Sequence, residues 1–192
     1  MKDFSSEPKQ HAILVAAWQA FATYGFRKTS MDDIARGAGM SRPAVYLHFK
    51  GKEEIFRSLV SHYYQGASAD VATALAEPGS PAEQLKRAFD AQTGETMAAM
   101  LTSPHGMELL DTGAATAADI KEEGEAKLTA LYADWLTREA EAGRIRLAGT
   151  AEAVAGTITS AMTAVKHDRS DYQTVKARLD LLAKMLGDGL AA

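Results

Sequence analysis

Basic and aromatic side chains gather in the segment RPAVYLHFKGK, residues 42–52. On a helix, Val45 and Phe49 lie one turn apart and would both pack inward. The side chains left facing largely outward are Arg42, Ala44, Tyr46, His48 and Lys50, with Lys52 just beyond Gly51. A guanidinium can pair bidentately with a guanine edge, and Tyr, His and Lys suit phosphate oxygens. The surface therefore suits a nucleic-acid groove.

Residues 29–41 contain helix-capping and turn residues that would fix the position of this face. Ser30 can cap a first helix with Asp33 completing a capping box, Gly39 suits a left-handed turn, and Ser41 can cap a second helix. The pattern predicts two short helices joined by a tight turn. An ordinary helical hairpin with a solvated basic face is the alternative. We favour DNA binding because the glycine turn, the two caps and the clustered basic and aromatic groups coincide.

The stretch resembles the DNA-binding domain of TetR-family transcriptional regulators over about residues 10–60. The resemblance rests on Gly25, Phe26, Thr29, Ser30, Ile34, Ala35, Ala38, Gly39, Ser41, Tyr46, His48, Phe49, Lys52, Glu53, Ile55 and Phe56. It implies a helix-turn-helix domain, a long helix that transmits a ligand signal, and a dimer. One position departs from the pattern, since Asp32 stands where the tetracycline repressor has a base-reading arginine.

Roles can be assigned to the side chains of this face. Because an acidic side chain at position 32 cannot repeat the arginine contact, base reading is expected from Arg42, with apolar contacts from Pro43 and Ala44. The residues expected to position phosphates are Ser30, Tyr46, His48 and Lys52. The operator sequence is not inherited from the tetracycline repressor.

Composition limits the remaining possibilities. The 192 residues are 46% hydrophobic and include no cysteine, which excludes disulfides and thiolate metal sites. Neither a leader peptide nor a membrane span is evident, so we expect a cytoplasmic protein without a membrane partner. Residues 1–60 hold nine Lys/Arg and six Asp/Glu, net +3, whereas residues 61–192 hold twelve and nineteen, net −7. A basic N-terminal unit can approach phosphates while the acidic remainder is repelled.

The rest of the chain predicts an all-α fold. We expect helices near 8–24, 52–77, 81–102, 104–112, 116–142, 151–167 and 171–187, in addition to the short pair. The clearest break is the segment EPGSP at residues 77–81. The expected organisation is a three-helix helix-turn-helix domain at 1–51, a connecting helix at 52–77, and a ligand-binding and dimerisation domain at 78–192.

The last two expected helices carry a wide apolar arc, which Leu181 and Met185 extend beyond a single contact seam. A wide arc suits two partners, the body of the chain on one side and a second subunit on the other; the alternative is a wholly intramolecular core. The expected dimer interface is Ala155, Ile158, Met162, Val165, Tyr172, Val175, Leu179, Leu182 and Leu186. Two-fold symmetry would place recognition helices about 34–36 Å apart and favour a palindromic operator.

Polar groups interrupt an apolar stripe on helix 81–102, where Gln92 and Thr96 follow Phe89. A mostly apolar pocket with few polar groups would bind a small effector. The candidate effector-binding residues are Phe89, Gln92, Thr96, Met97, Met100, His105, Met107, Tyr132 and Trp135. The alternative is that these side chains simply form core.

Two other functions are weaker alternatives. His105, Glu108 and Asp111 are spaced three residues apart, but three ligands over this span would splay around one helix, so we expect no catalytic residue, metal site or cofactor. A constitutive DNA-binding or architectural protein would use residues 78–192 for dimerisation only. A cavity of a few hundred Å³ within helices 81–142 would distinguish a ligand-responsive protein from that alternative.

Overall fold

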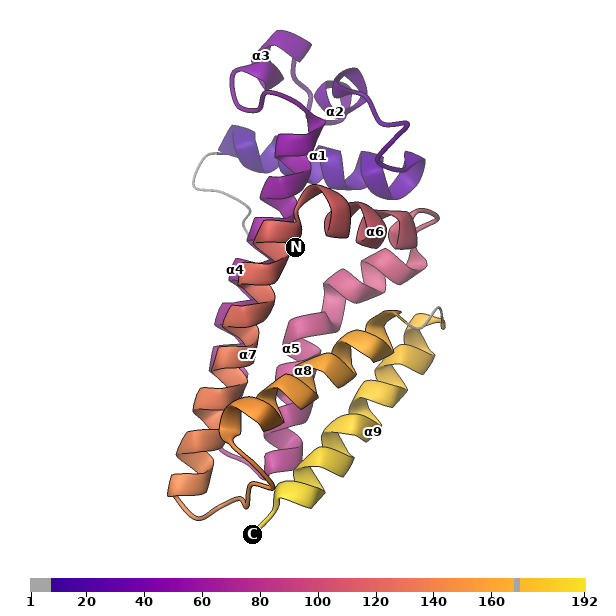
Figure 1. Cartoon of the computed structure of the whole chain (residues 1–192). Coiled ribbons are helices and arrows are strands. Elements are labelled where there is room, and N and C mark those ends of the chain that lie inside the picture. Colours follow the sequence, from indigo (N-terminus) through magenta and orange to yellow (C-terminus); the bar gives the residue numbers. More distant parts are fainter. Residues whose placement is uncertain (1–7, 168–169) are drawn as a thin grey trace. The chain divides into compact units, whose positions relative to one another are not determined.

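The computed structural model describes residues 8–167 and 170–192, except for the side chains of Met97, Gly113, Ala114 and His167. The helices, in chain order, are α1 Pro8–Tyr24, α2 Met31–Gly37, α3 Arg42–Tyr46, α4 Lys52–Ala76, α5 Pro81–Thr102, α6 Gly106–Thr116, α7 Ala118–Glu141, α8 Ala151–His167 and α9 Tyr172–Leu190 (Figure 1). Within the described ranges the β pairing is limited to one isolated antiparallel bridge between Ile145 and Ala191. The all-α prediction is confirmed.

The chain forms two compact units. Among the described residues, the first contains 8–64 and 99–122, and the second contains 65–98, 123–167 and 170–192. Residues of α6 join the first unit because α6 packs with the N-terminal helices, and the expected organisation into 1–51, 52–77 and 78–192 stays a prediction. Helices α4, α5 and α7 each continue from one unit into the other.

Aromatic rings from α1 and α4 fill the core of the first unit. The Phe21 ring lies 5.2 Å from that of Phe26 and 5.8 Å from that of Phe56, measured between centroids. Leu109 of α6 is buried in the same cluster, which explains why α6 belongs to this unit. Val45 and Phe49, which were expected to pack inward, are buried in this cluster with Phe21 and Ile34, and Trp18 and Phe26 lie half-buried at its edge.

Arg57 of α4 anchors the junction between α6 and α7 within the first unit. Its guanidinium donates to both carboxylate oxygens of Asp119, at 2.8 and 2.7 Å, and to the Thr116 carbonyl at 2.9 Å. The hydrogen bonds from Arg57 lower the pKa of Asp119 to about 2. The N-terminal part of α4 therefore contacts both the α2–α3 hairpin's core and the start of α7.

The second unit is held partly by close backbone approach. Helices α8 and α9 lie side by side (Figure 1), with Ile158 and Leu179 among their buried residues. Gly187 of α9 comes so close to α5 that a Cβ there would overlap the backbone of Ala82. Glycine is therefore required where α9 crosses α5.

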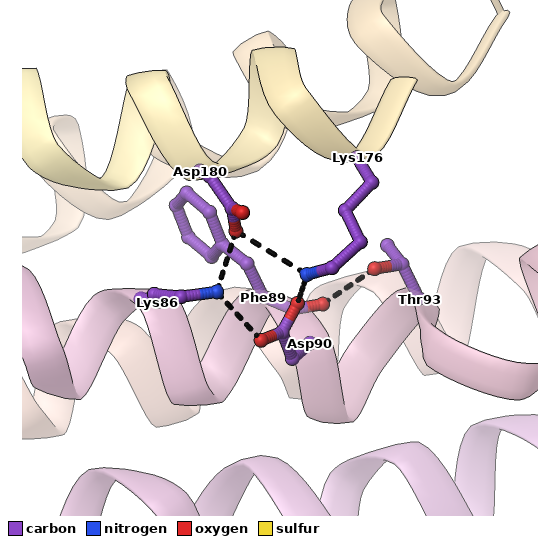
Figure 2. A network of polar contacts seen from close by, with 6 residues as sticks. All are labelled: Lys86, Phe89, Asp90, Thr93, Lys176 and Asp180. Carbon is purple, nitrogen blue, oxygen red and sulfur yellow. Dashed lines mark hydrogen bonds and ion pairs between the residues drawn. The ribbon is translucent and has the colours of Figure 1, made fainter. Parts of the chain in front are cut away.

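Four charged side chains also join α9 to α5 (Figure 2). The Lys86 ammonium lies 2.7 Å from Asp180 and 3.0 Å from Asp90, and the Lys176 ammonium lies 2.8 Å from Asp90 and 3.4 Å from Asp180. Burial raises the pKa of Asp90, but the hydrogen bonds from Lys176 and Lys86 outweigh it and the pKa is lowered. Because these side chains are partly solvent-exposed, each pair adds little stability, and the network mainly orients α9 on α5.

Several helix boundaries differ from those expected. Helix α5 spans the expected residues, but Gly94 has non-helical dihedral angles, φ −7° and ψ −116°, and interrupts its path. Helix α6 begins at Gly106 rather than at residue 104, and α9 continues to Leu190 rather than ending at residue 187. Across the described ranges, every helix is too short or too polar to cross a lipid bilayer.

Candidate nucleic-acid interface

Hydrogen bonds at the helix ends fix the hairpin of α2 and α3. The Ser30 side chain accepts the Asp33 N–H at 3.2 Å while the Asp33 carboxylate accepts the Ser30 N–H at 3.0 Å, which confirms the capping box. Gly39 has a φ of 65°, as its place in the turn requires. The Ser41 side chain accepts the Ala44 N–H at 3.3 Å and caps α3. The predicted pair of capped helices is confirmed.

Helix α3 is shorter than its sequence suggested, since it ends at Tyr46. The Phe49 N–H still donates to the Val45 carbonyl at 3.0 Å, so the following turn continues the helical path. Both Val45 and Phe49 are buried, as expected. The opposite face of this segment is therefore free to meet a partner.

The Arg42 guanidinium is held from two sides at the start of α3. Its Nη1 donates to Asp32 Oδ2 at 3.3 Å, and its Nη2 donates to the Tyr46 hydroxyl at 3.3 Å. The guanidinium carbon also lies 5.5 Å from the centre of the Tyr46 ring. The hydrogen bond with Tyr46, followed by the charge of Asp32, raises the pKa of Arg42. With its side chain 53% exposed, this oriented cation remains accessible.

The other predicted contacts on α3 are distributed around Arg42. Pro43 and Tyr46 are exposed, whereas Ala44 and His48 are half-buried. Leu47 was not among the predicted contacts, and 84% of its surface is exposed. Its position two residues after Val45 places it on the opposite face of the helical path, and this spacing was the available signal.

The structure gives Lys52 a different part from the phosphate contact that we expected. Its ammonium donates to the carbonyl oxygens of Phe26, Arg27 and Thr29, at 2.8, 3.0 and 3.0 Å, and lies 4.8 Å from the centre of the Phe26 ring. An ammonium has three N–H donors, and these carbonyls use all of them. The geometry therefore favours a structural role, in which Lys52 closes the α1–α2 connection onto α4.

Ser30 is also engaged within the hairpin. Besides capping α2, its hydroxyl donates to the Asp33 carboxylate at 2.6 Å. The Asp33 carboxylate also accepts from Arg36 at 3.4 Å. These hydrogen bonds to Ser30 lower the pKa of Asp33. Ser30 is exposed and its phosphate contact stays a prediction, but its first role is to start α2.

Four of the expected effector-binding residues are buried in the core of the second unit: Phe89, Gln92, Tyr132 and Trp135. Phe89 and Tyr132 are buried with ring centroids 6.1 Å apart, and the Tyr132 hydroxyl donates to Gln92 Oε1 at 3.0 Å. The Trp135 indole N–H donates at 3.3 Å to Gln84 Oε1, a buried partner that we had not predicted. Gln92, one of the two polar residues that suggested a pocket, thus binds the Tyr132 hydroxyl within the core in this structure.

The remaining effector candidates are not part of this cluster. Thr96 is half-buried beyond the interruption at Gly94, and the side chain of Met97 lies outside the described residues. Met100, His105 and Met107 belong to the first unit. Because Gly94 breaks the helical path of α5, the stripe read from an unbroken helix does not keep one face.

An open surface depression of about 320 Å³ lies in the first unit beside His105. It is lined by Thr23, Tyr24, Lys28, Asp33 and His105. His105 Nδ1 is 2.9 Å from Glu108, and the second oxygen of Glu108 accepts the Arg27 N–H at 3.5 Å. These contacts link the loop before α6 to the α1–α2 connection, so His105 and Glu108 have a packing role there. Among the described residues, no group of three or more His, Asp or Glu side chains is arranged to hold a metal ion.

We predict that Tyr132→Phe lowers the free energy of unfolding by about 1–2 kcal/mol, because Gln92 loses a buried hydrogen-bond donor. Urea denaturation of the full chain measures this change. Tyr24→Phe, on a tyrosine of α1 with 55% of its surface exposed, provides a comparison of the same chemical change. An unchanged stability for Tyr132→Phe would show that the hydrogen bond contributes nothing to the fold and would favour a ligand contact.

Most of the expected dimer interface lies in the core of the chain itself. The buried members are Ala155, Ile158, Met162, Val175 and Leu179, and the half-buried members are Val165, Tyr172, Leu182 and Leu186. The side chains on α9 that are open to a partner are Leu181 and Met185, with 57% and 64% of their surface exposed. The spacing of three and four residues therefore identified the faces of α8 and α9 that point into the core of the chain. Apolar residues repeat with this spacing both in a buried helix face and in a contact between subunits, so the spacing alone does not separate the two.

Comparison with known proteins agrees with the hairpin geometry. Residues 13–59 match the family model described as "Bacterial regulatory proteins, tetR family". The regulator EthR of Mycolicibacterium smegmatis is 32% identical over 87 residues, which cover 45% of this chain and 40% of EthR. AcrR of Shigella flexneri is 40% identical over 58 residues, covering 30% of this chain and 26% of AcrR. The sequence alignments thus span less than half of either relative.

The whole fold is also similar to solved structures. SmeT, the repressor of the Stenotrophomonas maltophilia multidrug efflux pump SmeDEF, has a TM-score of 0.74 at 17% identity, with 100% of this chain and 93% of SmeT covered. EthR, AcrR and SmeT are named as transcriptional regulators or repressors. Residues 13–59, which contain the capped hairpin and the exposed Arg42, thus carry a helix-turn-helix domain of the TetR family.

Proposed function

We propose that this protein is a cytoplasmic transcriptional regulator that binds a palindromic DNA operator as a homodimer and is released by a small, largely apolar effector. The observation that carries the proposal is the outer face of α3, where an oriented Arg42 is exposed beside Tyr46 and Leu47. A cation that can pair with guanine and an apolar side chain that can contact a thymine methyl suit major-groove reading. Residues 1–60, with a net charge of +3, favour approach to phosphates.

Selection of bound sequences from a random duplex pool, at near-physiological salt, tests DNA reading. The proposal predicts enrichment of a palindrome whose half-sites lie about one helical turn apart. Tyr46→Ala removes both a predicted phosphate contact and a support of Arg42, so the enrichment should weaken. Salt-sensitive binding without any enriched sequence would instead favour an architectural protein.

Leu47 provides a separate test of the recognition face. We predict that Leu47→Ser weakens binding to the enriched duplex by about 3- to 10-fold, because an apolar contact with a base edge is lost. Its high exposure means that unfolding should change by less than about 0.5 kcal/mol. Fluorescence anisotropy with the enriched duplex and urea denaturation measure the two effects. An unchanged affinity would remove Leu47 from the DNA contact.

For the dimer, we place the second subunit against the exposed side of α9 and its half-buried flank. Leu181 and Met185 lie four residues apart and therefore share one face, with Leu182 and Leu186 beside them. Large exposed apolar side chains that gather on one helix are typical of an interface. This arrangement keeps the half-buried part of the expected interface and leaves the buried stripe in the core of the chain.

We predict that Met185→Glu raises the dimer dissociation constant at least about 10-fold, because a charge would be buried without a partner. Analytical ultracentrifugation over a range of protein concentrations measures the constant. Thr137→Glu, at an exposed position of α7, adds the same charge away from this face and should leave the dimer intact. Equal dissociation constants for the two variants would place the interface elsewhere.

The proposed effector would enter the second unit near the Phe89, Gln92 and Tyr132 cluster and replace contacts that these groups now make with one another. The solved complex of SmeT with triclosan, which is 16% identical to this chain with a TM-score of 0.71, is an example of a small-molecule complex on a similar fold. Helix α4 continues from the first unit into the second and would transmit the change. Operator and effector must then weaken each other's binding by the same factor. Equal effector affinity with and without operator contradicts this mechanism.

Whether the protein represses or activates transcription requires a separate proposal. SmeT is named as a repressor, whereas the relative FasR of Mycolicibacterium smegmatis, 28% identical over 85 residues, is named as an activator. We propose repression, in which the bound dimer excludes polymerase from the promoter. A reporter driven by a promoter that contains the enriched sequence should be expressed less when the protein is present, and higher expression would identify an activator.

A further inference from the structure

We infer that Asp32 is a positioning residue for base recognition, which holds the Arg42 guanidinium in the orientation that reads guanine. The inference rests on the proposed DNA-binding function and goes beyond it, because it assigns a role to a carboxylate that cannot itself repeat an arginine contact. Through this role, Asp32 would help the exposed face of the hairpin to discriminate between DNA sequences. The residues involved come from both helices of the hairpin, Asp32 from α2 and Arg42 and Tyr46 from α3.

The geometry fixes the guanidinium at two of its nitrogens. Asp32 accepts from Nη1 across the turn at 3.3 Å, and the Tyr46 hydroxyl accepts from Nη2 one helical turn away at 3.3 Å. A guanidinium has five N–H donors, so these two contacts leave three for a nucleic acid. Arg42 is thus oriented without being saturated.

The stability of the fold does not explain this arrangement. The Asp32 and Arg42 side chains are 54% and 53% exposed, and an exposed ion pair contributes little to folding. The hairpin already has its own caps at Ser30 and Ser41, as well as a buried core through Val45. An acidic side chain also repels phosphates, which opposes DNA binding in general. A carboxylate in the first turn of α2 also interacts favourably with the helix dipole, but Asp33 already supplies one there. What distinguishes Asp32 is its contact with Arg42.

Orientation matters because a free arginine side chain has many rotamers. Fixing the guanidinium beforehand lowers the entropy lost on binding. A fixed orientation also limits which acceptors the guanidinium N–H groups can reach, and the adjacent O6 and N7 atoms of guanine match their geometry best. Without Asp32 the guanidinium could swing to the flanking phosphates, which carry no sequence information. Asp32 thus increases discrimination between sequences rather than affinity for DNA in general.

A different role for Asp32 gives the opposite expectation. If the carboxylate only occupies Arg42 until DNA displaces it, removing Asp32 should strengthen binding to the enriched duplex. A positioning role predicts weaker binding to that duplex and equal or stronger binding to unrelated duplexes, because the variant has one negative charge less. The ratio of the two affinities separates these cases.

The test compares the full-length protein with Asp32→Ala, Asp32→Asn and Glu53→Ala. For each, we would select sequences from a random duplex pool and measure affinities for the enriched and an unrelated duplex. We expect Asp32→Ala to lower the ratio about 2- to 5-fold, as the weak interaction of an exposed ion pair allows, and to relax the preference for one guanine in each half-site. Asparagine keeps an oxygen that can accept from Nη1, so Asp32→Asn should retain most of the preference. Glu53→Ala removes the same charge from the first turn of α4 and should keep the preferred guanine.

A double-mutant cycle shows whether Asp32 acts through Arg42. In an Arg42→Ala background, Asp32→Ala should no longer lower the affinity ratio, because no guanidinium remains to be positioned. An unchanged ratio in the single variant, tighter binding to the enriched duplex, or an equal loss in both backgrounds would each overturn the inference. If the wild-type protein enriches no sequence, the proposed DNA reading itself fails. If it enriches one and Asp32→Ala behaves like wild type, only the positioning role is lost.

Discussion

Replacing Lys52 with methionine is expected to lower the free energy of unfolding by about 2–4 kcal/mol, since charged hydrogen bonds are individually strong and their acceptors would remain. The ammonium donates to three backbone carbonyls between α1 and α2, and methionine cannot. Methionine retains much of the aliphatic stem that packs near Phe26, so the change mainly removes the donors and the charge. Chemical denaturation followed by circular dichroism measures the loss.

Lys50→Met is the matched control for Lys52→Met. Lys50 is an exposed lysine two residues earlier, so the control makes the same substitution and should change stability by less than about 0.5 kcal/mol. If Lys52 contacted phosphates, as the sequence predicts, its removal would instead weaken binding to all duplexes and flatten the dependence on salt. Normal stability combined with a flatter salt dependence would restore that phosphate role and contradict the structural one.

Arg42→Ala is expected to weaken binding to the operator by about 1–3 kcal/mol, or roughly 5- to 150-fold, because a bidentate contact with guanine is lost. The same change should relax the sequence preference at one base pair in each half-site. Because Arg42 is exposed and its ion pair is weak, the fold should be preserved. Fluorescence anisotropy with the selected duplex and with single-base variants measures both effects.

Arg36→Ala controls for the loss of positive charge. Arg36 lies at the end of α2, is largely exposed and pairs with Asp33. Its removal should lower affinity for specific and unrelated duplexes by similar factors, without changing the preferred bases. If Arg42→Ala behaves in the same way, Arg42 contacts phosphate rather than a base, and sequence reading must lie with other residues of α3.

Local signals in the sequence predicted the hairpin well. The capping box at Ser30, the left-handed Gly39 and the cap at Ser41 depend on neighbouring residues and a few hydrogen bonds, and each is present. Burial of Val45 and Phe49 followed from helical spacing in the same way. The same spacing also places Leu47 on the exposed face, but an apolar side chain is ordinarily expected in the core.

Long-range contacts were beyond the reach of sequence periodicity. The carbonyl partners of Lys52 lie more than twenty residues earlier, and the partner of Trp135 is Gln84, 51 residues away. Periodicity shows that a helix has an apolar stripe but not which surface covers it, so the buried seam of α8 and α9 was assigned to a second subunit. The break at Gly94 in turn separated residues that an unbroken helix would have aligned.

The ratio of two dissociation constants tests the central claim most directly. For the wild-type protein at near-physiological salt, we would measure binding to the selected duplex and to a scrambled duplex of the same length and composition. A sequence-reading regulator predicts a ratio of at least about 10³. A ratio near one, with affinity that falls steeply as salt rises, would show that the protein binds DNA without reading it.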